Sequence, residues 1–331
     1  MTVSLALRGH PSIPPATRQR ILTLARRHRY HPDPALAALN AYRRQSAKRV
    51  FQGTLGWITD FEERASWRRM PQAEGYFEGL VSRAGELGYR VEEFWAGEPG
   101  LGGGRLTQIL QARGIRGLVV APLPRPGMTL ALDWRGFTAV ALGYSLSEPR
   151  LHVVMNHQFR NMQQLVVCLH ERGYRRIGLA LPEGSDRRIG HSYLGGYLAA
   201  VRSLSCAELP VFENKTFSVV LMRRWFLRAK PDVIVVSQEW LQAVEDWLAG
   251  EKLRIPRDVG LAVPCLPFGE RRLAGMDEDP PAIGALAAET VVSHLHRNES
   301  GLPSRPLSIL VDAVWSPGRT VRFGSLVKTS G

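Results

Sequence analysis

The sequence has no apolar run that approaches the roughly twenty residues needed for a membrane-spanning helix. It also lacks the N-terminal charged-then-apolar pattern of a secretory signal. Cysteine is scarce, and Cys168, Cys206 and Cys265 are far apart in apolar surroundings, which argues against a disulfide framework or a zinc site. These absences predict a cytoplasmic protein with reduced core thiols and no membrane partner.

Complete catalytic motifs are also lacking. The glycine-rich stretch Gly100–Gly104 follows a predicted strand, as a phosphate loop does, but Arg105 occupies the position of the third glycine of a dinucleotide-binding motif. Ser185 and Asp186 stand near His191 without the strand–turn–helix pattern that exposes a nucleophilic serine. Neither stretch predicts an enzyme.

The histidines of a predicted helix give no metal site. His294 and His296, with Glu289 and Glu299 nearby, resemble a ligand set only by proximity in sequence. Residues two apart on a helix point to different faces, so the two imidazoles are not expected to share a metal ion. We therefore expect no enzyme activity, no cofactor and no metal.

Acidic residues are nearly absent from the first fifty residues. Ten lysines and arginines stand there against a single acid, Asp33, so this segment carries +9 of the formal net charge of +13. A basic surplus concentrated in one small terminal segment is typical of an element that binds a polyanion. The alternative is a solvated basic helix that has no partner.

Two helices and a proline-rich break are predicted within this basic segment. The first helix covers Thr2–Arg8 and the second Ala16–Arg29, with Pro15 in its first turn. Pro32 and Pro34 end the second helix. The second helix is expected to bury Ile21, Leu24 and Ala25 and to expose Arg18, Arg26 and Arg29.

From Thr54 onward, short apolar runs alternate with helical patterns. The expected strands are Thr54–Thr59, Arg90–Trp95, Gly117–Leu123, Thr138–Gly143, Arg176–Leu181, Leu209–Phe212, Val233–Ser237, Gly260–Pro264 and Leu307–Trp315. The expected helices are Glu74–Leu87, Arg105–Arg113, Gln158–Arg172, Gly190–Leu204, Ser218–Ala229, Trp240–Leu248 and Pro280–His296. Two such series predict an α/β protein with two lobes, each built on a parallel sheet covered on both faces.

The N-terminal motifs TVSLALRG and ATRQRILTLARRHRYHPDPALAAL resemble the headpiece of the lactose/galactose repressor family of bacterial transcription regulators. The resemblance implies a helix-turn-helix that reads double-stranded operator DNA and a hinge helix with a leucine wedge in the minor groove. The implied DNA-binding residues are Thr2, Ser4, Leu5, Arg8, Arg18, Ala35, Ala38 and the wedge Leu39. Because Met1 falls inside the expected recognition helix, we expect the motif to be truncated at its N-terminus.

The remaining chain resembles the core of the same family in an ordered set of landmarks, including GLVVAP, ERGYRRIGLAL, KPDVIVVS and GMDEDPPAIGALA. The resemblance implies two Rossmann-like lobes of the periplasmic-binding-protein-like type I fold, which the chain crosses three times. It divides the chain into a partial headpiece (1–31), a hinge helix and linker (32–49), an N-terminal lobe (50–152 plus 281–308) and a C-terminal lobe (153–280 plus 309–331).

Ligands of two-lobed folds bind between the lobes, at loops that follow the carboxyl ends of strands. The candidate effector-binding residues are Asp60, Phe61, Trp67, Tyr76, Pro122, Tyr144, Asn156, Tyr193, Gln238, Glu239 and Cys265. Tyr193 and Cys265 stand where sugar-binding members of the family have an arginine and an aspartate. Without these groups a simple sugar effector is not expected.

The resemblance thus implies a homodimeric transcriptional regulator that is controlled by an unknown small-molecule effector. Repression is the expected mode of regulation. Three alternatives remain open. A shortened regulator would bind ligand without reading DNA alone. A solute-binding protein would need a signal peptide and would not carry the basic segment. An enzyme on a similar core would need a catalytic constellation.

Overall fold

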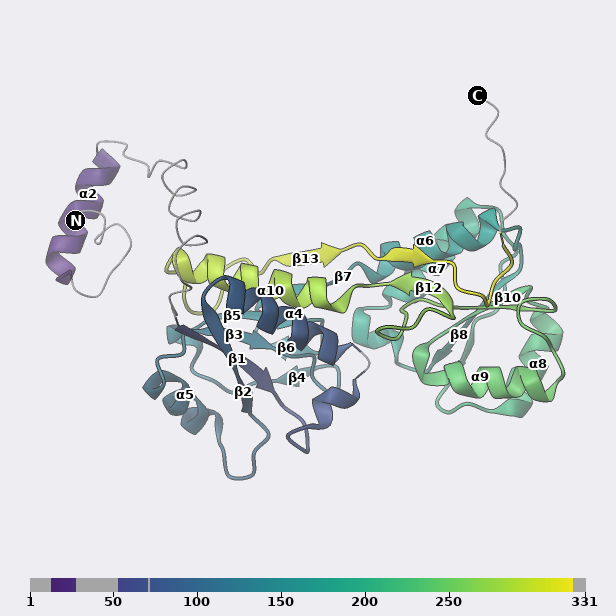
Figure 1. Cartoon of the computed structure of the whole chain (residues 1–331), viewed down its shortest axis with the longest axis horizontal. Coiled ribbons are helices and arrows are strands. Elements are labelled where there is room, and N and C mark those ends of the chain that lie inside the picture. The colour runs from purple at the N-terminus through teal and green to yellow at the C-terminus, as the bar shows by residue number, and fades with distance from the viewer. Residues whose placement is uncertain (1–12, 28–52, 71, 324–331) are drawn as a thin grey trace.

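The computed structural model describes residues 13–27, 53–70 and 72–323. Two α/β lobes lie side by side along the long axis (Figure 1), each with a six-stranded sheet. The first sheet has the order β13 (Ser308–Val311), β7 (His152–Asn156), β5 (Thr138–Leu142), β3 (Gly117–Val120), β1 (Gly53–Thr59), β2 (Tyr89–Trp95). The second has the order β14 (Val314–Ser316), β12 (Ala274–Asp277), β11 (Gly260–Val263), β10 (Val233–Val236), β8 (Ile177–Pro182), β9 (Phe212–Asn214).

Neighbouring strands are parallel throughout both sheets, except for the antiparallel pair of β12 and β14. A small parallel pair, β4 (Met128–Thr129) and β6 (Leu146–Glu148), belongs to the first lobe. The prediction of two lobes built on parallel sheets is therefore confirmed, whereas the headpiece is not.

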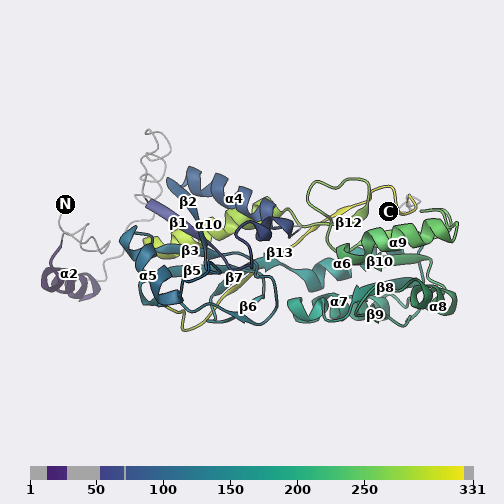
Figure 2. The same ribbon diagram turned by 90° about the horizontal axis from the view of Figure 1, so that it is seen from below.

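Helices cover both faces of each sheet (Figure 2). In the first lobe, α4 (Ala73–Glu86) and α10 (Pro280–His296) pack on one face and α5 (Gly103–Ala112) on the other. In the second lobe, α6 (Gln158–Glu171) and α7 (Ser192–Ser203) pack opposite α8 (Val219–Ala229) and α9 (Gln238–Gly250). Short 3₁₀ helices are η1 (Ser66–Arg69), η2 (Trp134–Gly136) and η3 (Asp186–Ile189).

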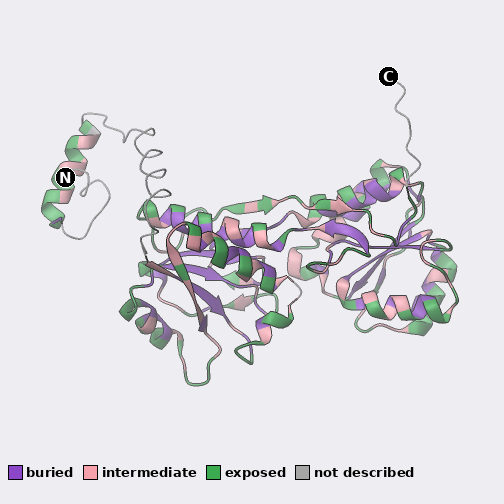
Figure 3. Ribbon diagram, viewed as in Figure 1, coloured by how far each residue is buried: buried purple, intermediate pink, exposed green. Residues whose placement is uncertain are grey.

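Burial explains why the strands are runs of aliphatic residues. The central strands β3, β5, β10 and β11 are buried at every position, while the helices expose their outer faces (Figure 3). A strand buried on both faces requires apolar side chains pointing in both directions. The sheets therefore form the rigid base from which the connecting loops project.

The helices α4 and α10 are in close contact because glycines replace side chains at their interface. A Cβ on Gly79 would lie 1.8 Å from the carbonyl oxygen of Pro281, and one on Gly284 would lie 1.9 Å from that of Tyr76. Helix α10 begins at a proline pair, and the Asp279 side chain accepts a hydrogen bond from the Ala282 N–H. This interface fixes the start of α4 next to the interlobe region.

The chain crosses between the lobes three times: after β7, between β12 and α10, and between β13 and β14. The predicted borders at 152/153, 280/281 and 308/309 lie near these positions. The first and third need correction, because the whole of β7 and the whole of β13 belong to the first sheet. Inter-strand hydrogen bonding, which local sequence does not reveal, sets these borders.

Several predicted elements differ from the structure. The expected single strand Leu307–Trp315 is wrong: it divides into β13 and β14, which belong to different sheets. The expected strand Leu209–Phe212 is displaced, because β9 covers Phe212–Asn214. Strands β7 and β12 were not expected.

Helix α2 (Pro15–Arg27) confirms a helix in the basic segment. Leu24 was expected to be buried but is 44% exposed, and Arg18 was expected to be exposed but is half-buried. The Arg18 guanidinium turns back along its own segment and donates a hydrogen bond to the carbonyl oxygen of Ile13 (3.3 Å), which reduces its exposure.

No helix in the described ranges is both long and apolar enough to cross a membrane.

Candidate functional site: the interlobe cleft

Residues that follow strands of both sheets meet between the lobes. Asn156, at the end of β7, donates a hydrogen bond from Nδ2 to Oε2 of Glu278, which follows β12 (2.5 Å). Cys265, which follows β11, donates from Sγ to the same carboxyl oxygen (3.0 Å). Gln72, at the start of α4, donates from Nε2 to Cys265 Sγ (2.7 Å), and the Asn156 amide lies 3.4 Å from the Tyr76 hydroxyl. We call Gln72, Tyr76, Asn156, Cys265 and Glu278 the inner cluster.

Burial dominates the electrostatics of the inner cluster. Glu278 is 4% exposed, and burial raises the pKa of its carboxyl to about 7, although the hydrogen bonds from Cys265 and Asn156 favour the charged form. Burial also raises the pKa of Tyr76, Tyr193 and Cys265, and the neighbouring Glu278 charge acts in the same direction on all three. The cleft thus holds an acid that is partly protonated near neutral pH.

Several buried oxygens of the inner cluster have no hydrogen-bond partner among the described residues. These are Oε1 of Gln72, Oδ1 of Asn156 and Oε1 of Glu278. A buried polar atom without a partner carries a desolvation cost. The inner cluster therefore has spare acceptors, the kind of group that a hydrogen-bond donor on a ligand would satisfy.

Arg188 of η3 ties the second lobe to the first. Its Nη2 donates to the carbonyl oxygen of Leu123 (2.5 Å) and its Nη1 to that of Pro124 (3.3 Å). Burial lowers the pKa of the guanidinium, while the charge of Glu239 raises it. On the opposite side of the cleft, Gln72 donates to the carbonyl oxygen of Leu266 (2.9 Å). The cleft is thus closed by hydrogen bonds between the lobes.

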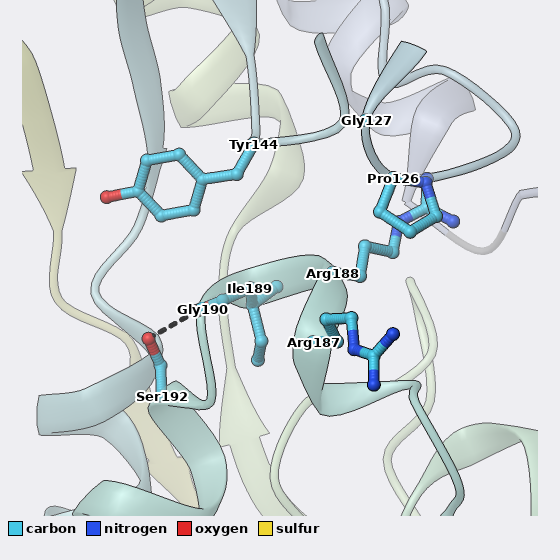
Figure 4. Close-up of a pocket in the computed structure, with 8 residues that line it drawn as sticks. All are labelled: Pro126, Gly127, Tyr144, Arg187, Arg188, Ile189, Gly190 and Ser192. Carbon is cyan, nitrogen blue, oxygen red and sulfur yellow. Dashed lines mark hydrogen bonds between the residues drawn. The ribbon is translucent and has the colours of Figure 1, made fainter. Parts of the chain in front are cut away.

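A cavity of about 700 Å³ lies between the lobes next to Arg188 (Figure 4). We call it the outer cavity. Its lining consists of Pro126, Gly127 and Tyr144 from the first lobe and of residues 187–190 and Ser192 from the second. This volume is within the range of sites that bind small molecules.

The structure brings together five of the predicted effector residues. Tyr76, Asn156 and Cys265 belong to the inner cluster. Tyr193 lies next to it, and Gln238 donates to the carbonyl oxygen of Cys265 (2.8 Å). Tyr144 lines the outer cavity. Their role in ligand binding remains a proposal.

The other predicted effector residues lie apart from these groups. Phe61 and Trp67 are 8% and 1% exposed and pack in the core of the first lobe, where Trp67 lies edge to face against Trp57. Asp60 is only partly exposed, and burial raises its pKa while Arg125 lowers it. Glu239 is exposed, and its charge acts on Arg188. Pro122 follows β3 and is half-buried.

Three residues of the cleft were missed from the sequence: Gln72, Arg188 and Glu278. Glu278 follows β12, so recognising that strand would have placed it by the same carboxyl-end rule that identified Gln238 after the strand Val233–Ser237. Gln72 immediately precedes a helix and Arg188 lies in a short 3₁₀ turn, where no pattern in the sequence distinguishes them.

The residues considered above as catalytic or metal-binding have structural partners. His294 is paired with Glu299 and stacks on His152 at 4.4 Å, whereas the His296 ring lies 3.2 Å from the Tyr89 hydroxyl. The Asp186 carboxylate accepts the Tyr193 and Leu194 N–H groups at the start of α7. The two histidines therefore face different neighbours.

Most of the predicted DNA-binding residues lie outside the described residues, namely Thr2, Ser4, Leu5, Arg8, Ala35, Ala38 and Leu39. Arg18 lies on α2, which contains no acidic residue in its sequence PATRQRILTLARR. Arg20 and Arg27 of the same helix are exposed.

Comparison with known proteins supports the fold. Residues 166–314 match the family model of the periplasmic binding protein-like domain. A search of curated proteins found no significant match. A putative transcriptional regulator of the LacI family from Rhizobium etli is 16% identical with a TM-score of 0.66, covering 82% of this chain and 99% of that one.

Two further solved structures cover almost the whole chain. The transcriptional regulator CelR in complex with cellobiose is 18% identical with a TM-score of 0.61, covering 95% of this chain and 94% of that one. The lac repressor dimer bound to operator and the anti-inducer ONPF is 15% identical with a TM-score of 0.58, covering 96% and 94%. The predicted resemblance is confirmed: the chain has a periplasmic-binding-protein-like domain and shares its fold with LacI-family regulators.

Proposed function

We propose that this protein is a homodimeric transcriptional regulator that binds operator DNA through its basic N-terminal segment and is controlled by a small molecule bound between its lobes. The observation that carries the proposal is the interlobe cleft. There, Gln72 and Asn156 of the first lobe meet Cys265 and Glu278 of the second, with three buried acceptor oxygens unpaired. Polar groups that converge between two lobes are typical of a ligand site.

The charge distribution supports the DNA-binding half of the proposal. The first fifty residues carry +9 of the net charge of +13, and α2 presents Arg20 and Arg27 to solvent. Lysines and arginines that neutralise phosphates release counterions, so binding should weaken steeply with added salt. Structures of similar fold include a regulator with cellobiose and a repressor dimer on operator DNA, a precedent for combining the two activities.

Fluorescence anisotropy of a labelled duplex from the DNA upstream of the protein's own gene tests this proposal. The full chain is titrated at several salt concentrations, with a scrambled duplex as competitor. Arg20→Ala should reduce the slope of log affinity against log salt by about 1 if Arg20 contacts a phosphate. Arg228→Ala on α8, an exposed arginine of the second lobe, is the matched control and should leave the slope unchanged.

Absence of salt-dependent, sequence-selective binding would overturn the DNA-binding proposal. The protein would then remain a ligand-binding protein of the same fold that does not read DNA alone. Sedimentation velocity of the same samples tests the homodimer: a monomer at the concentrations that bind DNA would contradict it.

A further inference from the structure

The outer cavity differs in chemistry from the inner cluster beside it. Tyr144 lines it from the first lobe, and Arg187, Arg188 and Ile189 line it from η3 of the second. In Figure 4 the Tyr144 ring and the Arg187 guanidinium lie on opposite sides of the view. The ring of Tyr144 and the side chains of Ile189 and Pro126 provide apolar wall. Tyr144 is 41% exposed, so its ring is available for contact with a ligand.

The charged side chains that line the outer cavity are both arginines, and the acceptors among its side chains are the hydroxyl oxygens of Tyr144 and Ser192. An arginine carries five N–H donors and no acceptor. No carboxylate or amide side chain is among the lining residues. Ser192 already donates from Oγ to the carbonyl oxygen of Ile189 (2.6 Å; dashed in Figure 4). A polyol needs acceptors for its hydroxyl hydrogens, so this lining suits a ligand that is itself rich in acceptors.

Arg187 is the positive group best placed to meet such a ligand. It is exposed, and its guanidinium makes no hydrogen bond or ion pair with any residue in the described ranges. Arg188 adds a second positive charge, although its Nη atoms already bind backbone carbonyls of the first lobe. Arg125, between Pro124 and Pro126, is also exposed.

The acidic side chains near the outer cavity are not among its lining residues. The carboxylate of Asp186, adjacent in sequence to Arg187, accepts two N–H groups of α7. Glu239 is exposed, and its negative charge raises the pKa of Arg188. Glu278 is buried in the inner cluster. Among the lining residues two arginines and no acid are found, and Glu239 is the acidic side chain whose charge acts on one of them, Arg188.

We propose that the outer cavity binds an anionic ligand, a phosphate or carboxylate attached to a ring or other apolar body. The anion would pair with Arg187, with Arg188 beside it, while the apolar body would pack on Tyr144 and Ile189. Arginine forms bidentate pairs with both phosphate and carboxylate groups. This inference rests on the proposed function, a small molecule bound between the lobes, and specifies a ligand class for the outer cavity beside the inner cluster.

Isothermal titration calorimetry of the full chain, without DNA and in a phosphate-free buffer, tests the ligand class. The probes are phenyl phosphate, benzoate and phenyl glucoside, which share a ring and differ in charge. An anionic probe should bind at least about tenfold more tightly than the neutral glucoside, and more weakly as salt is added. Arg187→Ala should weaken binding of that anion about tenfold or more, as expected for a charge-assisted hydrogen bond.

Arg228→Ala, an exposed arginine far along the second lobe on α8, is the matched control and should leave the affinity unchanged. Tighter binding of phenyl phosphate than of benzoate would assign the anion as a phosphate, and the reverse as a carboxylate. Equal or tighter binding of phenyl glucoside would overturn the anionic class while leaving an effector site in place. The absence of binding by any probe, or equal losses in the two variants, would also overturn it, and neither result bears on the DNA titration.

Discussion

Glu278 should make the stability of the protein depend on pH in the direction opposite to that of most carboxyl groups. Its pKa is raised by burial from the ordinary 4.5 to about 7 in the folded chain. Below pH 4.5 the group is protonated in both the folded and unfolded states. Between these two values the unfolded chain releases the proton while the folded chain retains it, so stability falls as the pH rises.

The magnitude follows from the difference between the two pKa values. It corresponds to roughly 3 kcal/mol of free energy of unfolding, lost between about pH 4.5 and pH 7. Glu278→Gln keeps the shape of the side chain but cannot ionise, and its amide can still accept hydrogen bonds from Asn156 and Cys265. We therefore expect the variant to match the wild type near pH 4.5 and to exceed its stability by up to roughly 3 kcal/mol at pH 8.

Urea unfolding monitored by tryptophan fluorescence across pH 4.5 to 8 measures this difference. Other carboxyl groups have lowered pKa values, such as Asp133 and Asp258 beside Arg135 and Arg254. They contribute equally to both proteins and cancel in the comparison. Glu98→Gln, which alters an exposed carboxyl, should keep the wild-type profile. A difference between wild type and Glu278→Gln that does not change with pH would refute the reasoning.

Two further predictions concern the helix interface and the closed cleft. Gly79→Ala places a Cβ 1.8 Å from the carbonyl oxygen of Pro281 and should destabilise the fold by about 1–3 kcal/mol in urea unfolding. Gly85→Ala on the same helix meets nothing within 4 Å and should be neutral or slightly stabilising, so equal losses would contradict the packing argument. Gln72→Ala combined with Arg188→Ala removes the donors to Leu266, Leu123 and Pro124 and should raise the radius of gyration in small-angle X-ray scattering by favouring an open cleft. An unchanged scattering curve for the double variant would show that these hydrogen bonds do not hold the lobes together.

The alternation of apolar runs and helical patterns was sufficient to predict two parallel sheets, because buried central strands such as β3 and β10 are continuous aliphatic runs. Strand β12 escaped prediction because Ala274–Asp277 contains no β-branched residue and includes a glycine. Its strand conformation comes from pairing with β11 and β14. The division of Leu307–Trp315 into two strands could not be predicted from the sequence either, because it depends on which sheet each half joins.

The rule of strand carboxyl ends predicted part of the candidate site. Gln238 and Tyr144 follow predicted strands: Gln238 donates to the carbonyl oxygen of Cys265, and Tyr144 lines the outer cavity. Phe61 also follows a predicted strand, but it is buried in the core of the first lobe. Trp67 was proposed because it is close in sequence to the loop after β1, but its ring turns into the core against Trp57 and Phe77. Sequence proximity to a loop says nothing about which way a large apolar side chain points, and burial favours the core.

The hydrogen bonds across the cleft limit how strongly the closed arrangement is favoured. Gln72 donates to Leu266, and Arg188 donates to Leu123 and Pro124, all through backbone carbonyls. At roughly 1 kcal/mol each, three such bonds amount to about 3 kcal/mol, or a ratio of about one hundred between closed and open forms. A ligand that binds the open form about a hundredfold more tightly than the closed form would therefore bring the two forms to about equal populations, and a larger preference would make the open form dominant. Because Arg188 both ties the lobes and lines the outer cavity, an anion bound there would compete for the guanidinium and weaken the closure that it supplies.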